Sequence, residues 1–256
     1  MKANYKNWVP KELVAGTLIG LIILIAAAAA AFVHGLTVPA VILSLAAFVC
    51  ALFAIWCVYA YIMFSYNGKR KLSKQIINGI AEYIKLPDGG ICLDVGCGSG
   101  ALTIAAAKKN PNAKILGIDR WGKEYVSFSE KLCEKNAKAE NVSNVSFKQD
   151  DAVHLSFQDE TFDTVTSNYV YHNIIGKNKQ ELLLETLRVL KKGGTFAIHD
   201  IMSKSRYGDM QRFADKLKEL GFEEVRLIDT TDGKFMTKCE SLFMMLSGSA
   251  LLVGKK

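Results

Sequence analysis

The stretch that decides the fold is Leu93-Asp94-Val95-Gly96-Cys97-Gly98-Ser99-Gly100-Ala101. It continues a short apolar run, residues 91–95, that has the pattern of a buried strand, and it leads into a helix-like segment, residues 101–109. Glycine lets the backbone between them turn sharply and approach a ligand, and the amino end of a helix offers free N–H groups to an anion. The stretch therefore predicts a strand, a ligand-binding loop and a helix, which together begin a βαβ unit.

Strand-like and helix-like segments alternate on both sides of this loop. Further strands are predicted at residues 113–118, 145–148, 164–167, 195–199, 224–228 and 250–254, and further helices at 72–85, 124–136, 179–190 and 209–220. This alternation is typical of a parallel sheet with helices on both faces. We therefore predict one α/β domain over residues 67–256, where the composition is that of an ordinary globular protein.

Acidic residues stand in or at the end of each of the first three predicted strands. Asp119 ends the second strand, where a carboxylate can accept two ribose hydroxyls, and Asp150-Asp151 close the third, within reach of an adenine amine. The spacing of Gly96, Gly98 and Ala101 also fits the dinucleotide pattern of nicotinamide and flavin enzymes. Asp94 disfavours that alternative, because it would repel a pyrophosphate but can meet an ammonium group. The pattern favours an adenosine-containing cofactor that carries an amine.

Four motifs in a fixed order extend this interpretation. They are LDVGCGSG at 93–100, GID at 117–119, QDDAVHLSFQDETFDTVTSN at 149–168 and LRVLKKGGTFAIHD at 187–200. With these motifs the chain resembles the class I S-adenosylmethionine-dependent methyltransferases over about residues 72–254. The resemblance implies S-adenosylmethionine as cofactor and a Rossmann-like sheet of seven strands, of which the last, residues 250–254, runs antiparallel.

The resemblance also implies which residues bind the cofactor. Gly96, Gly98 and Gly100 would pack against its methionine end, Asp94 would hold the amino group, Asp119 the ribose, Asp151 with Ala152 the adenine, and Asn168 would line the floor beside the methyl group. Trp121, just past Asp119, is expected either to stack on adenine or to cap the core.

The segment after the fourth strand, Tyr169-Val170-Tyr171-His172-Asn173, is expected at the carboxyl end of the sheet, where ligands bind. His172 is the candidate proton acceptor, with a positioning role as the alternative. Tyr169 and Tyr171 are predicted to wall the acceptor site, with Asn173 and Asp200 beside them. His199 and Asp200 have hydrogen-bonded structural roles as alternatives. No ligand cluster has the spacing of a metal site.

Residues 1–66 are predicted to be a membrane anchor. Two uncharged apolar runs, about residues 13–33 and 38–64, each have the roughly 20 residues that a helix needs to cross a bilayer. His34-Gly35 and Pro39 predict a turn between them. Lysines precede the first run and Lys69-Arg70-Lys71 follow the second, so both termini and the large domain are expected in the cytoplasm. A cleaved signal peptide is the alternative, but its apolar region would be too long.

These features together predict a membrane-anchored methyltransferase that acts on a hydrophobic small molecule or lipid. The apolar, Met-rich residues Phe235-Met236 and 242–246 fit either an adaptable pocket or membrane contact, or an ordinary core helix. The alternatives are methylation of a membrane-associated protein, or a tethered cofactor-binding module without catalysis. The net charge of +7 is assigned to the lipid surface, because the densest basic cluster directly follows the second apolar run. Nucleic acid is not expected as a partner, since the chain lacks Asn-Pro-Pro-Tyr or Asp-Pro-Pro-Tyr, the signature of methyltransferases of the class it resembles that act on amino groups of bases or glutamine. The oligomeric state is left open.

Overall fold

The computed structural model describes residues 2–122 and 127–256. They form two compact units, of which one is Lys6–Lys74 and the other is Gln75–Lys256 together with residues 2–5. The division differs from the expected boundary at residue 66 in two ways. The division falls within the first helix after the apolar runs, α3 (Leu72–Ala81), and residues 2–5 belong to the large unit.

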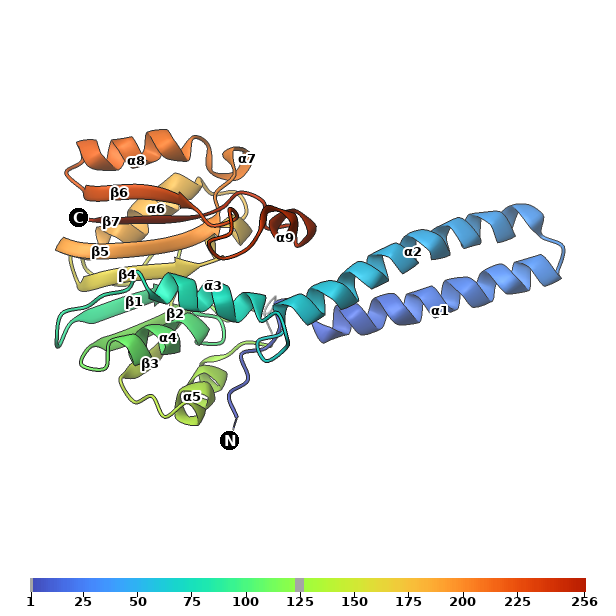
Figure 1. Ribbon diagram of the computed structural model, residues 1–256, viewed down its shortest axis with the longest axis horizontal. Helices are drawn as coiled ribbons and strands as arrows, with labels where there is room; N and C mark the ends of the chain where they lie inside the picture. The colour runs from blue at the N-terminus through green and yellow to red at the C-terminus, as the bar shows by residue number, and fades with distance from the viewer. Residues whose placement is uncertain (1, 123–126) are drawn as a thin grey trace. The chain divides into compact units, whose positions relative to one another are not determined.

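The smaller unit is a hairpin of two long helices, α1 (Lys11–Val33) and α2 (Thr37–Phe64), joined by a turn at residues 34–36 (Figure 1). Three alanines of α2 at seven-residue spacing, Ala40, Ala47 and Ala54, are buried, as small residues at a close helix–helix seam are. At the open end of the hairpin, the rings of Trp8 and Phe64 lie 5.2 Å apart. Both helices are long and apolar enough to cross a membrane, with mean hydropathies of 2.6 and 2.7.

The larger unit contains a seven-stranded sheet in the order β3-β2-β1-β4-β5-β7-β6. Its strands are β1 (Ile91–Val95), β2 (Lys114–Asp119), β3 (Val145–Gln149), β4 (Phe162–Asn168), β5 (Leu190–Ile201), β6 (Glu223–Asp229) and β7 (Ser249–Lys255). The first five are mutually parallel, and β7 is antiparallel to both of its neighbours. This confirms the predicted Rossmann-like methyltransferase sheet and its antiparallel last strand.

Helices cover both faces of the sheet, as the alternation along β1 shows. Leu93 and Val95 point into a hydrophobic cluster that includes residues of α6 (Lys179–Arg188) and α8 (Met210–Glu219). Asp94 points to the opposite face, where Thr103 of α4 (Ala101–Lys109) donates a hydrogen bond to it. The other helical elements are α5 (Glu130–Ala139), the 3-10 turn η2 (Tyr171–Asn173), α7 (Lys204–Tyr207) and α9 (Lys238–Phe243).

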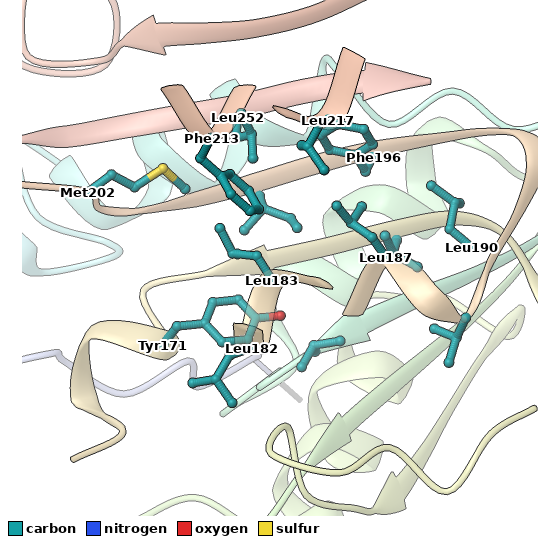
Figure 2. Close-up of a cluster of buried hydrophobic side chains, with 14 of the residues drawn as sticks. Tyr171, Leu182, Leu183, Leu187, Leu190, Phe196, Met202, Phe213, Leu217 and Leu252 are labelled. Carbon is teal, nitrogen blue, oxygen red and sulfur yellow. The ribbon is translucent and has the colours of Figure 1, made fainter. Parts of the chain in front are cut away.

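The main core lies between the sheet and the helices α6 and α8, which cover one of its faces. Figure 2 shows Leu183 and Leu187 of α6 beside Phe213 of α8 and Phe196 of β5. Each of these side chains is 2% exposed or less, so each contributes about 1.5–3 kcal/mol by leaving water. This packing fixes the carboxyl ends of β4 and β5, on which the acceptor side of the site is built.

Most predicted elements agree with the structure to within a few residues. The helix predicted at 124–136 is observed as α5, Glu130–Ala139, and the first residues of the prediction, 124–126, lie outside the described residues. The strand predicted at 195–199 begins five residues earlier, at Leu190, because Leu190 pairs with Phe162 across an irregularity in the β4–β5 ladder. The short helices α7 and α9 were not predicted as such.

Candidate functional site

The carboxyl ends of β1, β2, β3, β4 and β5 lie along one edge of the sheet, because these five strands are parallel. The amino end of β7 joins the same edge, since β7 is antiparallel and its Ser249 is paired with Ile201 at the end of β5. The loops at this edge carry the residues that the sequence singled out. The edge has two halves, one over β1–β3 and the other over β4–β5.

Asp94 is a buried carboxyl behind the glycine loop. It is 1% exposed, and its Oδ2 accepts a 2.6 Å hydrogen bond from the hydroxyl of Thr103. Burial, aided by the negative charge of Asp119, raises the pKa of Asp94 to about 7 despite that hydrogen bond. A cationic group bound beside the two carboxyls would relieve their repulsion and favour the ionised form of Asp94.

The three glycines of the loop all have positive φ, between 57° and 78°, but they differ in their surroundings. A Cβ on Gly96 would lie 2.2 Å from a methyl of Val170, and one on Gly100 would lie 3.1 Å from the ring of Phe147. A Cβ on Gly98 would meet no atom within 4 Å. Gly96 and Gly100 are therefore needed for close packing of the protein itself, and Gly98 borders open space where a ligand can approach the backbone.

Asp119, at the end of β2, holds the outer part of this loop. Its Oδ2 accepts from the amide of Gly98 at 2.9 Å and its Oδ1 from the amide of Trp121 at 2.8 Å. The indole Nε1 of Trp121 in turn donates to the carbonyl of Gly98 at 3.0 Å. Asp119 and Trp121 thus lie against the open glycine.

The two acidic residues after β3 have different hydrogen-bond partners. Asp150 accepts from the amide of Asp151 and from the hydroxyl of Ser156, so it builds the turn. Asp151 is half-buried and uses Oδ1 to accept from the amide of Val153, and Ala152 between them is also half-buried. Asp151 and Ala152 therefore stand at the carboxyl end of β3, next to the strand that ends in Asp119.

The residues present suit a cofactor with an adenosine end and an ammonium end. The Asp94 carboxyl lies behind the loop and the Asp119 carboxylate lies at its outer part. The space beside Gly98 is open, so a ligand can approach the backbone there. A dinucleotide would bring a pyrophosphate to the loop beside the Asp94 carboxyl, which would repel it when ionised.

Asn136 of α5 ties this half of the site to the start of the chain. Its Nδ2 donates to the carbonyl of Ser99 and to that of Asn4, each at 3.0 Å, and its Oδ1 accepts from the amide of Asn4 at 2.8 Å. The Asn136 side chain is buried, as is Tyr5. Asn4 is therefore linked to the glycine loop through Asn136. Sequence reasoning missed Asn136 and Thr103, because neither belongs to a recognisable local motif.

On the acceptor half, His172 is paired with Asp200. The Nδ1 atom of His172 lies 2.5 Å from Oδ1 of Asp200, whose Oδ2 accepts from the backbone amides of Tyr171 and His172. Burial by itself would raise the pKa of Asp200, but the hydrogen bond and the charge of His172 outweigh it and lower the pKa. Because an ionised carboxylate only accepts hydrogen bonds, the Nδ1 of His172 carries a proton and its Nε2 is the basic nitrogen.

A second polar network connects β4, β5 and β7 beside this pair. The ring nitrogens of His199 lie 2.8 Å from Oδ1 of Asn168 and 2.9 Å from the hydroxyl of Thr230. Burial lowers the pKa of His199 to about 3, so this imidazole is neutral and structural. The hydroxyl of Tyr169 lies 2.8 Å from that of Ser249, which donates to the carbonyl of Leu246. Tyr169 has a φ of 56°, which turns the chain at the end of β4.

Two residues that were expected to face the acceptor are buried. Tyr171 is fully buried in the core, where its hydroxyl lies 2.6 Å from that of Thr186 (Figure 2). Asp200 is also fully buried, beneath His172. As folded, neither side chain can wall or touch a substrate, and we correct both assignments. Tyr169 is half-buried and Asn173 is exposed, so these two remain available at the rim.

The fold and this edge define a nucleotide-cofactor enzyme of the Rossmann-like methyltransferase class. A family model described as a methyltransferase domain matches residues 86–240, more than half of the chain. The protein therefore belongs to the family of S-adenosylmethionine-dependent methyltransferase domains. In the part of the chain that the structure describes, no group of three or more His, Cys, Asp or Glu side chains could hold a metal ion.

Similar proteins act on several kinds of molecule. The demethylmenaquinone methyltransferase of Lactobacillus johnsonii is 34% identical over 120 residues, which are 45% of either chain. That of Bacillus licheniformis is 29% identical over 66% of either chain. The erythromycin 3''-O-methyltransferase of Saccharopolyspora erythraea is 30% identical over 53% of this chain and 42% of that protein. The match thus spans about half to two thirds of these relatives.

Solved structures agree on the fold. The [4+2]-cyclase SpnF superposes with a TM-score of 0.55 at 20% identity, over 72% of this chain and 81% of its own. A geranyl diphosphate methyltransferase bound to its substrate and sinefungin superposes with a TM-score of 0.53 at 12% identity, over 70% and 76%. At such identities the likeness concerns the fold alone.

Proposed function

We propose that this protein transfers the methyl group of S-adenosylmethionine to a hydrophobic small molecule or lipid at a membrane. The observation that carries the proposal is the convergence of two devices on one edge of the sheet. One is the glycine loop with Asp94 and Asp119 behind it, and the other is the His172–Asp200 pair. A cofactor cradle and an oriented base at one edge are what a methyl transfer that also removes a proton requires.

The bound cofactor supplies a methyl group on a sulfonium sulfur, which is already a good leaving group. The protein's part is to align the two molecules and to handle the proton. Asp94 and Asp119 would hold the amino and ribose ends of the cofactor. Gly98 leaves room for it, Asp151 with Ala152 and Trp121 would contact the adenine, and Asn168 would lie beside the methyl group. Holding two reactants in line can contribute about 7–11 kcal/mol toward the barrier.

His172 would accept the acceptor's proton at Nε2. Asp200 fixes the tautomer and the orientation of the ring and stabilises the imidazolium that forms, so it acts as a positioning residue. Tyr169 would provide an amphipathic wall, since its ring packs edge-on to that of His172 at 5.9 Å. Asn173 at the rim can meet a polar group of the acceptor.

A hydrophobic acceptor is supported by the relatives and by the hairpin. The names of two relatives specify demethylmenaquinone as acceptor, and others specify natural products such as erythromycin. The two apolar helices of this chain have outward faces rich in exposed large side chains, such as Ile22, Phe32 and Phe48. A bilayer is the environment that such faces suit, and a tethered enzyme meets lipid-soluble molecules at high local concentration.

We further propose a two-pass topology with both termini and the methyltransferase domain in the cytoplasm. Lysines and arginine flank the open end of the hairpin, and the turn at residues 34–36 carries no Lys or Arg. The contacts of Asn4 with Asn136 support the same arrangement, because residues 2–5 then belong to the domain and lie on its side of the membrane. Modification of Lys2→Cys and His34→Cys variants by a membrane-impermeant thiol reagent, on intact cells and on inverted vesicles, tests it.

The test of the function is an assay with S-adenosylmethionine labelled in the methyl group. The full chain in lipid nanodiscs is incubated with a membrane extract, and the label is followed into the organic, protein and aqueous phases. The proposal expects label in the organic phase and a much slower transfer after His172→Ala. Label in protein would favour methylation of a membrane-associated protein. Tight cofactor binding without transfer to any phase would leave only a cofactor-binding module.

A further inference from the structure

Most of the exposed large apolar side chains of the methyltransferase unit lie at one edge of its sheet. Among its described residues there are five of them, Ile175, Leu220, Leu242, Phe243 and Met245. All except Leu220 lie in two short segments, one after η2 and the other in and after α9. Ile175 is 94% exposed, Leu242 74% and Met245 72%. We refer to Ile175, Leu242, Phe243 and Met245 as the apolar rim.

The apolar rim lies at the edge of the sheet that carries the site. Ile175 comes three residues after His172, beyond the carboxyl end of β4. The other segment leads into the amino end of β7, which lies at the same edge. Hydrogen bonds connect this second segment to the acceptor half. The hydroxyl of Ser249 donates to the carbonyl of Leu246 and is hydrogen-bonded to the hydroxyl of Tyr169.

The segment around α9 that carries the exposed side chains is held by buried neighbours and by a capped helix start. In the segment around α9, Met244 and Leu246 are buried while Leu242, Phe243 and Met245 point outward. The helix starts with a reciprocal pair of bonds, in which Thr237 caps the amide of Glu240 and Glu240 accepts from the amide of Thr237. Some residues of this stretch thus belong to the core and others to the surface. The buried neighbours and the capped helix start hold three large apolar side chains outside the core.

Basic side chains accompany the apolar rim. Lys177 follows Ile175 and is exposed, as are Lys204 and Arg206 of α7. Gln180, at the start of α6, donates to the carbonyl of Tyr207, which brings α7 to the segment that carries Lys177. Apolar tips with neighbouring cationic side chains complement a membrane surface, where acyl chains lie beneath anionic headgroups.

We propose that the apolar rim is a contact of the methyltransferase unit with an anionic bilayer, through which a lipid-soluble acceptor passes to His172. The rim would enter the boundary between headgroups and acyl chains, a layer that amphipathic segments occupy to a depth of about 5–10 Å. The proposal rests on the proposed function in one respect, that the acceptor is lipid-soluble. The contact itself does not depend on the helical hairpin, since it involves residues of the methyltransferase unit.

Cys239 of α9 provides a probe, because it is the exposed cysteine of the described residues. The full chain with Cys50→Ser is labelled at Cys239 with an environment-sensitive fluorophore and reconstituted into vesicles of phosphatidylcholine with or without phosphatidylglycerol. The control carries Cys50→Ser, Cys239→Ser and Leu220→Cys, with the label at the exposed apolar position outside the rim. Lipids with a quencher near the headgroup then report contact, and flotation of the vesicles reports anchoring separately.

The proposal expects the label at Cys239 to shift to the blue and to be quenched by these lipids, more strongly with phosphatidylglycerol, while the label at position 220 stays aqueous. The double variant Leu242→Ser/Met245→Ser should lose most of the quenching and keep its affinity for S-adenosylmethionine. Equal, weak quenching at both positions in floating vesicles would overturn the proposal. So would shielding that depends on protein density and not on quencher, which would indicate contact between two copies. Quenching at Cys239 without methyl transfer would instead contradict the proposed function and leave the contact intact.

Discussion

The buried carboxylate of Asp200 lies 2.5 Å from Nδ1 of His172, and the same carboxylate accepts the backbone amides of residues 171 and 172. The side chain and the backbone of the 3-10 turn are thus held by one group. His172 keeps 14% of its side chain exposed, while Asp200 is fully covered. The turn therefore presents one ring edge at the rim of the site and buries the group that orients it.

His172→Ala is expected to lower kcat by about 10²–10⁴, the range for loss of a positioned general base, with little change in cofactor affinity. Asp200→Asn should also lower kcat, because an amide can stabilise the other tautomer of the imidazole and cannot stabilise its charged form. Steady-state kinetics with calorimetric titration of the cofactor separates the two effects. Unchanged kcat in His172→Ala across the pH range would remove this residue from the mechanism.

Cofactor affinity is expected to rise with pH through the titration of Asp94. Its pKa is about 7 in the folded protein, so the carboxyl is neutral below that pH and cannot hold an ammonium group electrostatically. Between pH 6 and pH 7.5 the ionised fraction grows, and the affinity should increase about fivefold after allowance for the amine's own titration near 7.7–8.0. Titrations at both pH values check this, and Asp94→Asn should bind weakly with no such dependence. A wild-type affinity that is flat over this interval would contradict the assignment.

The buried Asp94 also predicts how stability changes with pH in the absence of cofactor. Its pKa is raised from 3.8 to about 7 on folding, so the folded state binds the proton more tightly than the unfolded state. The contribution of this group is most favourable below pH 3.8 and is lost as the pH rises through 7. Asp94→Asn should therefore flatten the decline of the free energy of unfolding between about pH 4 and pH 7, measured by denaturant unfolding.

Asp119→Ala is expected to weaken cofactor binding by about 10² or more, because it removes both the ribose partner and the acceptor that holds Gly98 and Trp121. Calorimetry measures the affinity, and a thermal scan shows whether the domain is still folded. Asp119→Asn is the matched variant, since it keeps an oxygen acceptor without the charge, and it should be intermediate. Wild-type affinity in a folded Asp119→Ala protein would refute the ribose assignment.

The glycines of the loop should separate fold from ligand binding. Gly96→Ala is expected to destabilise the domain by about 1–3 kcal/mol, because its Cβ would overlap Val170. Gly98→Ala has open space and should lose about 1–2 kcal/mol through backbone strain alone, yet weaken cofactor binding. Gly193→Ala is the control for that strain, because it also has positive φ and open space but lies in β5, at the other edge of the sheet. If Gly98→Ala and Gly193→Ala bind the cofactor alike, Gly98 does not border it.

Asn4→Pro and Asn4→Ala form a matched pair for the N-terminal segment. Proline removes the amide that donates to Asn136, whereas alanine keeps both backbone bonds. Hydrogen exchange of the amides near Ser99 should therefore become faster in Asn4→Pro and stay near wild type in Asn4→Ala. Equal exchange in all three proteins would show that the segment does not hold the glycine loop.

How much of this could be predicted from the sequence depends on how local each feature is. The strand, loop and helix around Gly96–Gly100 were predicted with the bounds that the structure has, because the glycine spacing and apolar run are local signals. Tyr171 was misplaced, because only its contact with Thr186 on α6 shows that the 3-10 turn rotates it into the core while His172 stays outside. The strand predicted at 195–199 left out the glycines at 193–194, but pairing of Leu190 with Phe162 of β4 extends β5 through them. Asn136 acts across 132 residues of sequence, and no local pattern reveals such a partner.

Titration of the protein with S-adenosylmethionine, in parallel with a nicotinamide dinucleotide, tests the central claim most directly. The account predicts saturable binding of S-adenosylmethionine that Gly98→Ala and Asp119→Ala weaken and Gly193→Ala leaves unchanged, with no binding of the dinucleotide. Binding of the dinucleotide in place of S-adenosylmethionine, or affinity that is indifferent to Gly98 and Asp119, would contradict it.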